Sequence, residues 1–172
     1  YLEKILWVFS GYPTALLTTY ENDEIDVHAL SAIELDRIEA DDRLSSELVR
    51  SHSNTTWYLF FKTGSVPFRN SSVRRAIGHA IDRNVLSNTV LKGAALPAFT
   101  MMPPGMRDHL NKEFSEYQRY DPDLARRLLA EAGYPGGRGL PKLEMWLRQA
   151  DGMQLQAAQA IQAMLKENLG ID

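Results

Sequence analysis

The chain has 172 residues, 44% of them hydrophobic and 24% charged, which are ordinary values for a globular protein. Its formal net charge of −3 at pH 7 creates no electrostatic field that favours nucleic acid. Because the chain contains no cysteine, disulfides, thiolate metal sites and cysteine nucleophiles are excluded. It also has no apolar run of about 18 residues, the length that a membrane-spanning helix needs.

The two ends indicate a piece of a longer protein. Tyr1 is not an initiator residue, and Asp172 ends the chain where a helix is expected to lead into a strand. No signal peptide is visible. We therefore expect the chain to be incomplete at both ends.

The first third of the chain predicts strands that alternate with helices. Ile5–Ser10 is a near-continuous apolar run, typical of a strand that is buried on both faces. The order of the elements that follow indicates a mixed α/β layer. They are a helix over Thr14–Tyr20, a strand over Ile25–Ala29, a helix over Ala32–Ala40 capped by Ser31, and strands over Leu44–Ser51 and Thr55–Lys62.

Two consecutive helices are predicted in the middle of the chain. Either Ser71 or Ser72 can accept the first free amide of the first helix. Asp82-Arg83-Asn84 then ends this helix and caps a second one, Val85–Leu91, which Gly93 stops. The apolar face of the first helix repeats every four residues and consists of Val73, Ile77 and Ile81.

The C-terminal part predicts two helices around a strand. Asp121-Pro122-Asp123 is a strong helix start, with Asp at the N-cap and Pro at the first position, and Gly133 ends that helix. A strand is expected over Lys142–Leu147 and a second helix over Gln154–Leu169. The apolar faces of these helices are Leu124, Leu128 and Leu129, and Leu155, Ala158, Ile161, Leu165 and Leu169.

Short motifs follow one another along nearly the whole chain. They are Glu24-Ile25-Asp26-Val27, Trp57-Tyr58-Leu59-Phe60-Phe61, Pro67-Phe68, Val73-Arg74-Arg75-Ala76, Ala80-Ile81-Asp82-Arg83, Val90-Leu91-Lys92-Gly93, Pro97-Ala98, Pro103-Pro104, Tyr120-Asp121-Pro122 and Glu131-Ala132-Gly133-Tyr134-Pro135. In this order and spacing the chain resembles the family 5 extracellular solute-binding proteins of bacterial ABC importers, the peptide and oligopeptide binders. Two residues depart from the family pattern, since Asp23 stands where Gly is usual and Lys62 where Asn is usual.

The resemblance implies an α/β fold, a fragment of a two-lobe periplasmic-binding-protein type II fold with mixed sheets flanked by helices. Residues 1–54 would end the first lobe and residues 55–172 would begin the second. The implied function is that of an extracytoplasmic solute-binding subunit, periplasmic or a cell-surface lipoprotein, which captures peptides or similar small solutes between two lobes. Its implied partners are the solute and the ABC permease subunits, with no nucleic acid, and with a membrane only through an anchor or permease outside this chain.

No pattern of catalytic or metal-binding residues is present, so we expect neither enzymatic activity nor a bound cofactor or metal. The four histidines, His28, His52, His79 and His109, show no metal-ligand spacing, and His79 is expected to have a structural role at the surface or half-buried. The glycine-rich segment 136–139 precedes a strand and not a helix, which favours a turn over a phosphate cradle.

The candidate binding residues are two aromatic rings and one loop. Trp57 and Tyr58 are consecutive in a predicted strand, so one of them must face away from the core, where it can stack on a ligand. Core packing is the alternative for each ring. The loop with Arg148, Gln149 and Asp151 follows a predicted strand, and such strand ends line ligand crevices in open α/β sheets. Arg148 suits a carboxylate such as a peptide C-terminus, with a solvated loop as the alternative.

Two functions of other classes remain open. A ligand-sensing domain of a transcriptional regulator built on the same lobe would carry a DNA-binding helix-turn-helix upstream of Tyr1. An importer subunit would instead carry a signal peptide with a lipid-anchored cysteine there. A hydrolase would need a nucleophile and a base in contact, for which the sequence has no Gly-x-Ser-x-Gly elbow and no cysteine.

Overall fold

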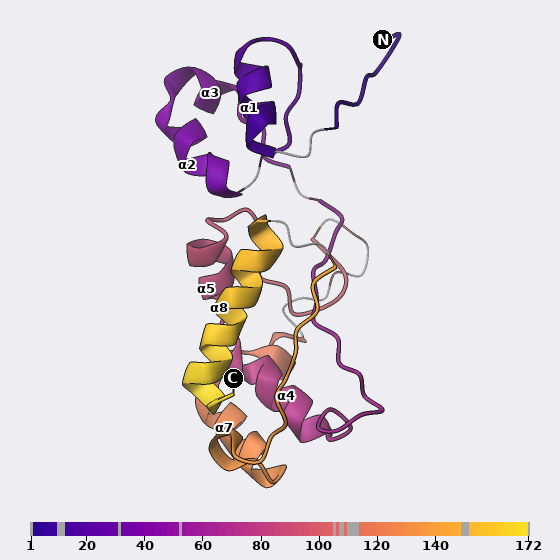
Figure 1. Cartoon of the computed structure of the whole chain (residues 1–172), viewed down its shortest axis with the longest axis vertical. Helices are drawn as coiled ribbons and strands as arrows, with labels where there is room; N and C mark the ends of the chain where they lie inside the picture. The colour runs from indigo at the N-terminus through magenta and orange to yellow at the C-terminus, as the bar shows by residue number, and fades with distance from the viewer. Residues whose placement is uncertain are drawn as a thin grey trace. The chain divides into compact units, whose positions relative to one another are not determined.

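The computed structural model describes residues 2–9, 13–30, 32–51, 53–104, 106, 109, 114–148 and 152–171. Contacts between residues divide the chain into two units, Tyr1–Leu48 and Val49–Asp172 (Figure 1). Each unit is described by itself, and the assignment of residues 1–54 and 55–172 to two lobes stays a prediction. No helix in the described part of the chain is both long enough and apolar enough to span a membrane.

The first unit contains three short helices, α1 (Pro13–Glu21), α2 (Ala32–Ala40) and α3 (Asp42–Glu47). Each helix contributes one buried leucine or isoleucine to a small core formed by Leu17, Ile38 and Leu44. The Asp41 carboxylate accepts a hydrogen bond from the backbone N–H of Leu44 at 2.9 Å and thereby caps α3. This cap explains why residues 44–47, predicted as the beginning of a strand, are helical.

The second unit is built around α4 (Ser71–Ala80), α7 (Pro122–Glu131) and α8 (Gly152–Leu169). Both α7 and α8 pack on α4, and α7 also packs on α8 (Figure 1). The residues predicted to fill the core are confirmed as buried, namely Val73, Ile77, Ile81, Leu128, Leu129, Ile161 and Leu165. Leu155 was placed on the same face of α8 by the sequence pattern, and this placement is wrong because its side chain is 44% exposed.

Hydrogen bonds from capping side chains set the helix starts of the second unit. Asn70 caps α4 by accepting the backbone N–H of Ser72 at 2.9 Å, so the expected cap at Ser71 or Ser72 lies one or two residues too late. Asp121 caps α7 as predicted, accepting the N–H of Leu124 at 2.9 Å. Asp82 also acts as predicted, and it begins the short helix α5 (Arg83–Val85), which continues as the π-helical turn η1 (Leu86–Val90).

Two buried polar side chains join the ends of these helices. The Nδ1 atom of His79 donates to the carbonyl of Arg119 at 2.8 Å, and the His79 carbonyl accepts the N–H of Asp121 at 2.9 Å. The Nδ2 atom of Asn168 donates to the carbonyl of Ala80 at 2.9 Å. The end of α4 is therefore fixed to the start of α7 and to the end of α8. His79 has a structural role as expected, but its side chain is buried, not at the surface or half-buried as predicted.

The expected sheets are not seen, since no strand occurs among the described residues. The segments 5–9, 25–29, 55–62 and 142–147 have no regular secondary structure, and the predicted strand over 44–51 begins inside α3. Ser10 and Ser31 lie outside the described residues. A strand is stabilised by the backbone of a neighbouring strand, and no backbone hydrogen bond joins these segments to one another in the described part. Their apolar patterns alone therefore did not produce a sheet.

Candidate functional site

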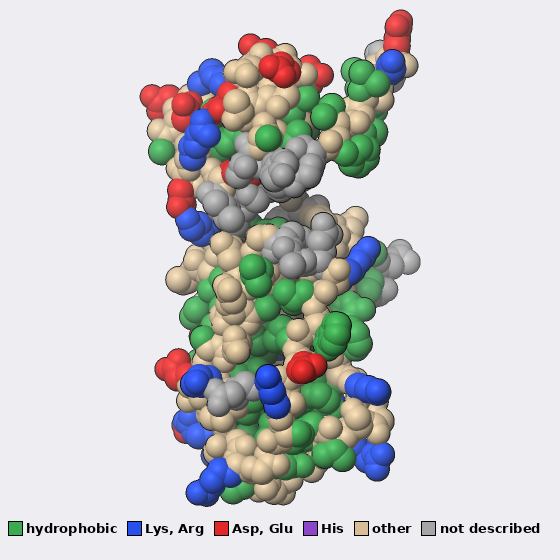
Figure 2. Space-filling model, viewed as in Figure 1, with side chains coloured by type: hydrophobic (Ala, Val, Ile, Leu, Met, Phe, Trp, Pro, Cys, Tyr) green, Lys and Arg blue, Asp and Glu red, His purple; other side chains and the backbone are tan. Residues whose placement is uncertain are grey.

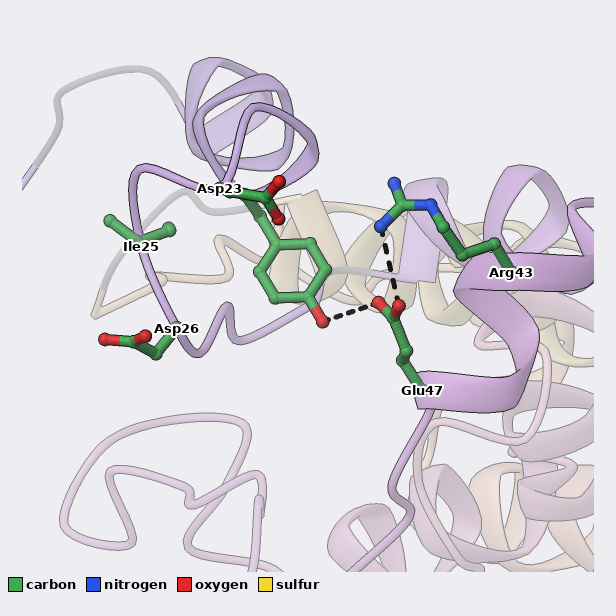
Figure 3. A pocket seen from close by; sticks show the side chains of 6 residues that line it. Asp23, Ile25, Asp26, Arg43 and Glu47 are labelled. Atoms are coloured by element: carbon green, nitrogen blue, oxygen red, sulfur yellow. Dashed lines mark hydrogen bonds and ion pairs between the residues drawn. The ribbon is translucent and has the colours of Figure 1, made fainter.

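A pocket of about 240 Å³ lies in the first unit, between the end of α1, the loop that follows it and α3 (Figure 3). Three carboxylates and one guanidinium line it, so the lining favours a positively charged group over an anion. The lining side chains are Tyr20, Asp23, Ile25, Asp26, Arg43 and Glu47. The sequence patterns did not predict a pocket here.

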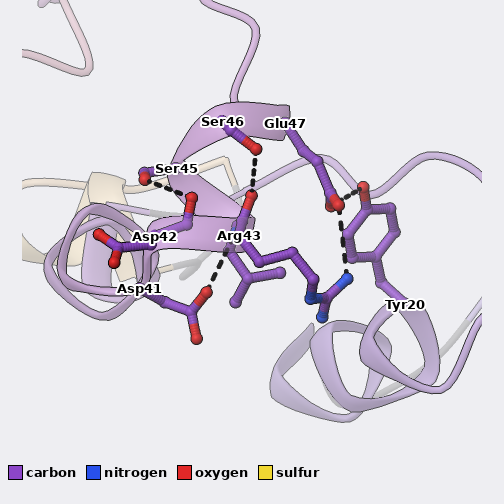
Figure 4. A network of polar contacts seen from close by, with 8 residues as sticks. Tyr20, Asp41, Asp42, Arg43, Ser45, Ser46 and Glu47 are labelled. Atoms are coloured by element: carbon purple, nitrogen blue, oxygen red, sulfur yellow. Dashed lines mark hydrogen bonds and ion pairs between the residues drawn. The ribbon is translucent and has the colours of Figure 1, made fainter.

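Glu47 organises one wall of this pocket (Figure 4). The Tyr20 hydroxyl donates to Glu47 Oε2 at 2.7 Å, and Arg43 Nη1 donates to Glu47 Oε1 at 3.4 Å. The hydrogen bond to Glu47 is the main reason that the pKa of the Tyr20 hydroxyl is raised above its ordinary value. The Tyr20 hydroxyl is thus protonated at neutral pH and acts as a hydrogen-bond donor to Glu47.

Asp23 lines the pocket and has an unusual backbone conformation. Its φ angle is 60°, in the left-handed region that favours glycine. It ends α1 in a Schellman arrangement, where the N–H of Asp23 donates to the carbonyl of Tyr20 and the N–H of Glu24 donates to that of Thr19, both at 3.0 Å. This conformation explains why glycine is usual at position 23 in the family pattern, and here a carboxylate takes its place.

Trp57 and Tyr58 lie on an extended segment of the second unit, and their side chains are 60% and 61% exposed. The segment is held at both ends. Thr56 Oγ1 donates to the carbonyl of Met101 at 3.0 Å, and the ring of Phe61 packs on Phe68 at a centroid distance of 5.0 Å. Neither predicted ring is packed into the core of the described residues, and their contact with a ligand stays a prediction.

Arg148 is exposed at the end of a second extended segment, residues 141–148, which has no regular secondary structure. Gln149 and Asp151 lie outside the described residues. Trp146, two residues before Arg148, is 87% exposed and was not among the predicted site residues. The sequence could have indicated Trp146, because side chains two residues apart in a strand lie on the same face and Arg148 was already a candidate.

A half-buried guanidinium fixes the loop between η1 and α7. Arg83 Nη1 donates to the carbonyl of Gln118 at 2.8 Å, and its Nη2 donates to Gln118 Oε1 at 2.6 Å. Gln118 Nε2 in turn donates to the carbonyl of Phe99 at 3.2 Å. Burial lowers the pKa of Arg83, but the guanidinium stays charged because the ordinary pKa of arginine lies far above neutral pH. The loop is therefore held at Phe99 and Gln118, with exposed Met101 and Met102 between them.

The comparison with protein families identifies the chain. The family model for bacterial extracellular solute-binding proteins, family 5, middle region, matches residues 1–172. The chain belongs to this family. The resemblance predicted from the motifs is thereby confirmed, and so is its assignment to bacterial extracellular solute-binding proteins.

Two curated relatives show how much of a complete protein is covered. Heme-binding protein A of Haemophilus influenzae is 41% identical over 80 residues, which are 46% of this chain and 14% of that protein. Oligopeptide-binding protein OppA of Bacillus subtilis is 30% identical over 120 residues, which are 67% of this chain and 22% of that protein. The chain therefore matches less than a quarter of the length of either relative.

A solved structure supports the fold. The murein tripeptide binding protein MppA of Escherichia coli superimposes with a TM-score of 0.73 at 23% identity, over 92% of this chain and 31% of that one. The chain is thus a fragment of a periplasmic binding protein fold, of which the described residues form helices and irregular segments.

Proposed function

We propose that residues 1–172 are part of an extracytoplasmic solute-binding subunit of an ABC importer, which captures peptides or similar small solutes and delivers them to a permease. Membership of the solute-binding family supports the class of function. The names of an oligopeptide-binding relative and of a structural neighbour that binds a murein tripeptide support a peptide-like solute. Family membership is also the basis for the permease as partner.

The architecture proposed for the complete protein is the two-lobe type II fold. Residues 1–54 belong to the first lobe and residues 55–172 to the second. The solute is captured between the lobes by hinge closure, which gives recognition without chemistry. The division of the chain into units at Leu48 supports a boundary in this region.

The proposed solute-contacting residues are Trp57, Tyr58, Arg148, Gln149 and Asp151. One observation carries this proposal, namely that two adjacent large aromatic side chains are each more than half exposed on a segment anchored by Thr56 and Phe61. Exposed aromatic surface of this kind marks binding sites, because a ring supplies a large contact area and few rotatable bonds. Arg148 adds a planar fork for a solute carboxylate.

Calorimetry on the full-length protein tests the proposal with a set of short peptides. Tyr58→Ala and Arg148→Ala are each expected to weaken binding by about 1–3 kcal/mol through a lost stacking or charged contact. Tyr117→Ala is a matched control, because this ring is also exposed but lies outside the proposed site. Unchanged affinity in both site variants would remove these residues from the site, and absence of peptide binding would refute the peptide-like solute.

A further inference from the structure

A half-buried arginine holds the loop to which the segment with Trp57 and Tyr58 is attached. Arg83 lies just after α4, and its Nη1 atom donates to the carbonyls of Gly78 and Ile81 at 3.1 and 3.3 Å. A guanidinium is planar and presents its N–H donors in a fixed fork. These hydrogen bonds therefore fix the orientation of the arginine at the end of α4.

From this position Arg83 holds the loop at residues 95–101 through two contacts. Its Cζ atom lies 5.7 Å from the centroid of the Phe99 ring, within the range of a cation–π contact. Gln118, which accepts from the Nη2 atom of Arg83 at 2.6 Å, donates to the Phe99 carbonyl at 3.2 Å. The ring and the backbone of Phe99 are thus both held by the same guanidinium, one directly and one through Gln118.

The loop held in this way carries the acceptor that anchors the aromatic segment. Its start is fixed as well, because the buried Ser87 hydroxyl donates to the Ala95 carbonyl at 2.6 Å. Further along the loop, the Met101 carbonyl accepts the hydroxyl of Thr56, which directly precedes Trp57, at 3.0 Å. A change in the position of the loop is therefore transmitted to the aromatic segment.

The aromatic segment depends on such a contact because no backbone ladder fixes it. Residues 55–62 have no regular secondary structure. Rings that are already held in place lose less conformational freedom when a solute binds, and affinity rises accordingly. We infer that Arg83 is a positioning residue for solute binding, which holds Trp57 and Tyr58 in place through the loop. This inference rests on the proposed solute-binding function and needs no contact between Arg83 and the solute.

Calorimetry of the full-length protein with short peptides, combined with urea unfolding, tests the inference. Arg83→Met removes the donors and keeps a long side chain, and it is expected to weaken peptide binding about tenfold. Arg126→Met is the matched control, because Arg126 also donates to a backbone carbonyl, that of Asn168 at 3.3 Å, but joins α7 to α8. It should bind peptide as the wild type does. Lower stability of Arg83→Met with unchanged affinity of the folded protein would overturn the inference.

A second pair of variants tests the route without changing the arginine. Thr56→Val removes only the hydroxyl of a half-buried side chain, so it should leave the free energy of unfolding nearly unchanged. It is expected to weaken peptide binding about two- to tenfold, and Thr56→Ser should recover the lost affinity. In the Thr56→Val background, Arg83→Met should have little further effect, because both changes release the same contact. Fully additive losses would overturn the inference.

Fluorine NMR tests the position of Trp57 without any solute. In the full-length protein labelled with 5-fluorotryptophan, the Trp57 resonance is the one that Trp57→Phe lacks. Arg83→Met and Thr56→Val are both expected to shift this resonance, and Arg126→Met is expected to leave it in place. An unshifted resonance in Arg83→Met would overturn the inference. Absence of peptide binding by the wild type would instead refute only the peptide-like solute proposed above, because the resonance reports whether Arg83 holds the segment.

Discussion

The helical core and the extended segments of the second unit carry similar apolar side chains, but they differ in burial. Leu129 in α7 is 1% exposed, whereas Trp57 and Trp146 in the extended segments are mostly exposed. Figure 2 shows hydrophobic side chains on the visible face of this unit. Because α4, α7 and α8 pack on one another, their apolar faces are buried against each other in one core.

The difference follows from where each element finds its backbone hydrogen bonds. A helix satisfies its amides within the segment, so an apolar stripe and a cap are enough to form it and to direct its packing. An extended segment needs a neighbouring strand for the same purpose. The aromatic segments of this chain therefore keep their rings available, either for solute or for parts of the protein outside these residues.

The largest expected effect is a loss of core packing. Leu129→Ala should reduce the free energy of unfolding by about 2–5 kcal/mol, because the side chain is fully buried. Leu155→Ala, on the exposed side of α8, should change it by less than about 0.5 kcal/mol. Urea unfolding of both variants of the full-length protein measures the contrast. Equal losses would mean that the core is not where the structure places it.

A second prediction concerns the contact that closes the helical core. Gly93 and Gly137 both have a φ angle of 76°. A Cβ atom on Gly137 would lie 2.5 Å from the carbonyl oxygen of Gly170, whereas a Cβ atom on Gly93 would have no heavy atom within 4 Å. Gly93→Ala should cost about 1–2 kcal/mol for the left-handed backbone alone. Gly137→Ala should cost about 1–3 kcal/mol more, because it separates the turn η3 (Pro135–Gly137) from the end of α8.

Thermal denaturation compares the two alanine variants under identical conditions. Equal destabilisation of Gly93→Ala and Gly137→Ala would show that the close approach to Gly170 does not exist.

The smallest effect is a pH dependence at the start of α7. The hydrogen bond from the Leu124 N–H is the main cause that lowers the pKa of Asp121 below 3.8. Since the folded-state pKa is the lower one, the stabilisation is complete above the unfolded value and is lost as the pH falls through the folded value. Asp121→Asn should keep the cap at neutral pH and flatten the loss of stability below about pH 4. Melting temperatures of the wild type and of Asp121→Asn, measured across this pH range, test the prediction. Parallel plots of melting temperature against pH would contradict a contribution from Asp121.

The helices were predictable from the sequence because their signals are local. Asp82, Asp121 and the apolar repeats of α4 and α7 act as the pattern indicates. The expected strand over 44–51 was wrong at its start because Asp41, three residues before it, caps the helix α3. The other expected strands depend on pairing with residues distant in sequence, which no local pattern specifies.

The candidate site was predictable only in part. The side-chain alternation of an expected strand pointed to one of Trp57 and Tyr58 as exposed. No strand is seen there, and both rings are exposed, which is compatible with a binding role. The pocket at Asp23 was not predicted because it depends on a left-handed backbone conformation at the end of α1. The presence of Asp where the family usually has Gly was the feature of the sequence that could have indicated it. The role of Arg83 was missed because its partner Gln118 lies 35 residues away.

Oxidative footprinting of the full-length protein, with and without a bound peptide, tests the central claim most directly. We predict that Trp57 and Tyr58 are readily oxidised in the free protein and protected when the peptide binds, while Tyr117 reacts equally in both states. Protection of Trp57 and Tyr58 already in the free protein would show that they belong to a core, and reactivity that peptide binding leaves unchanged would contradict their place in the solute site.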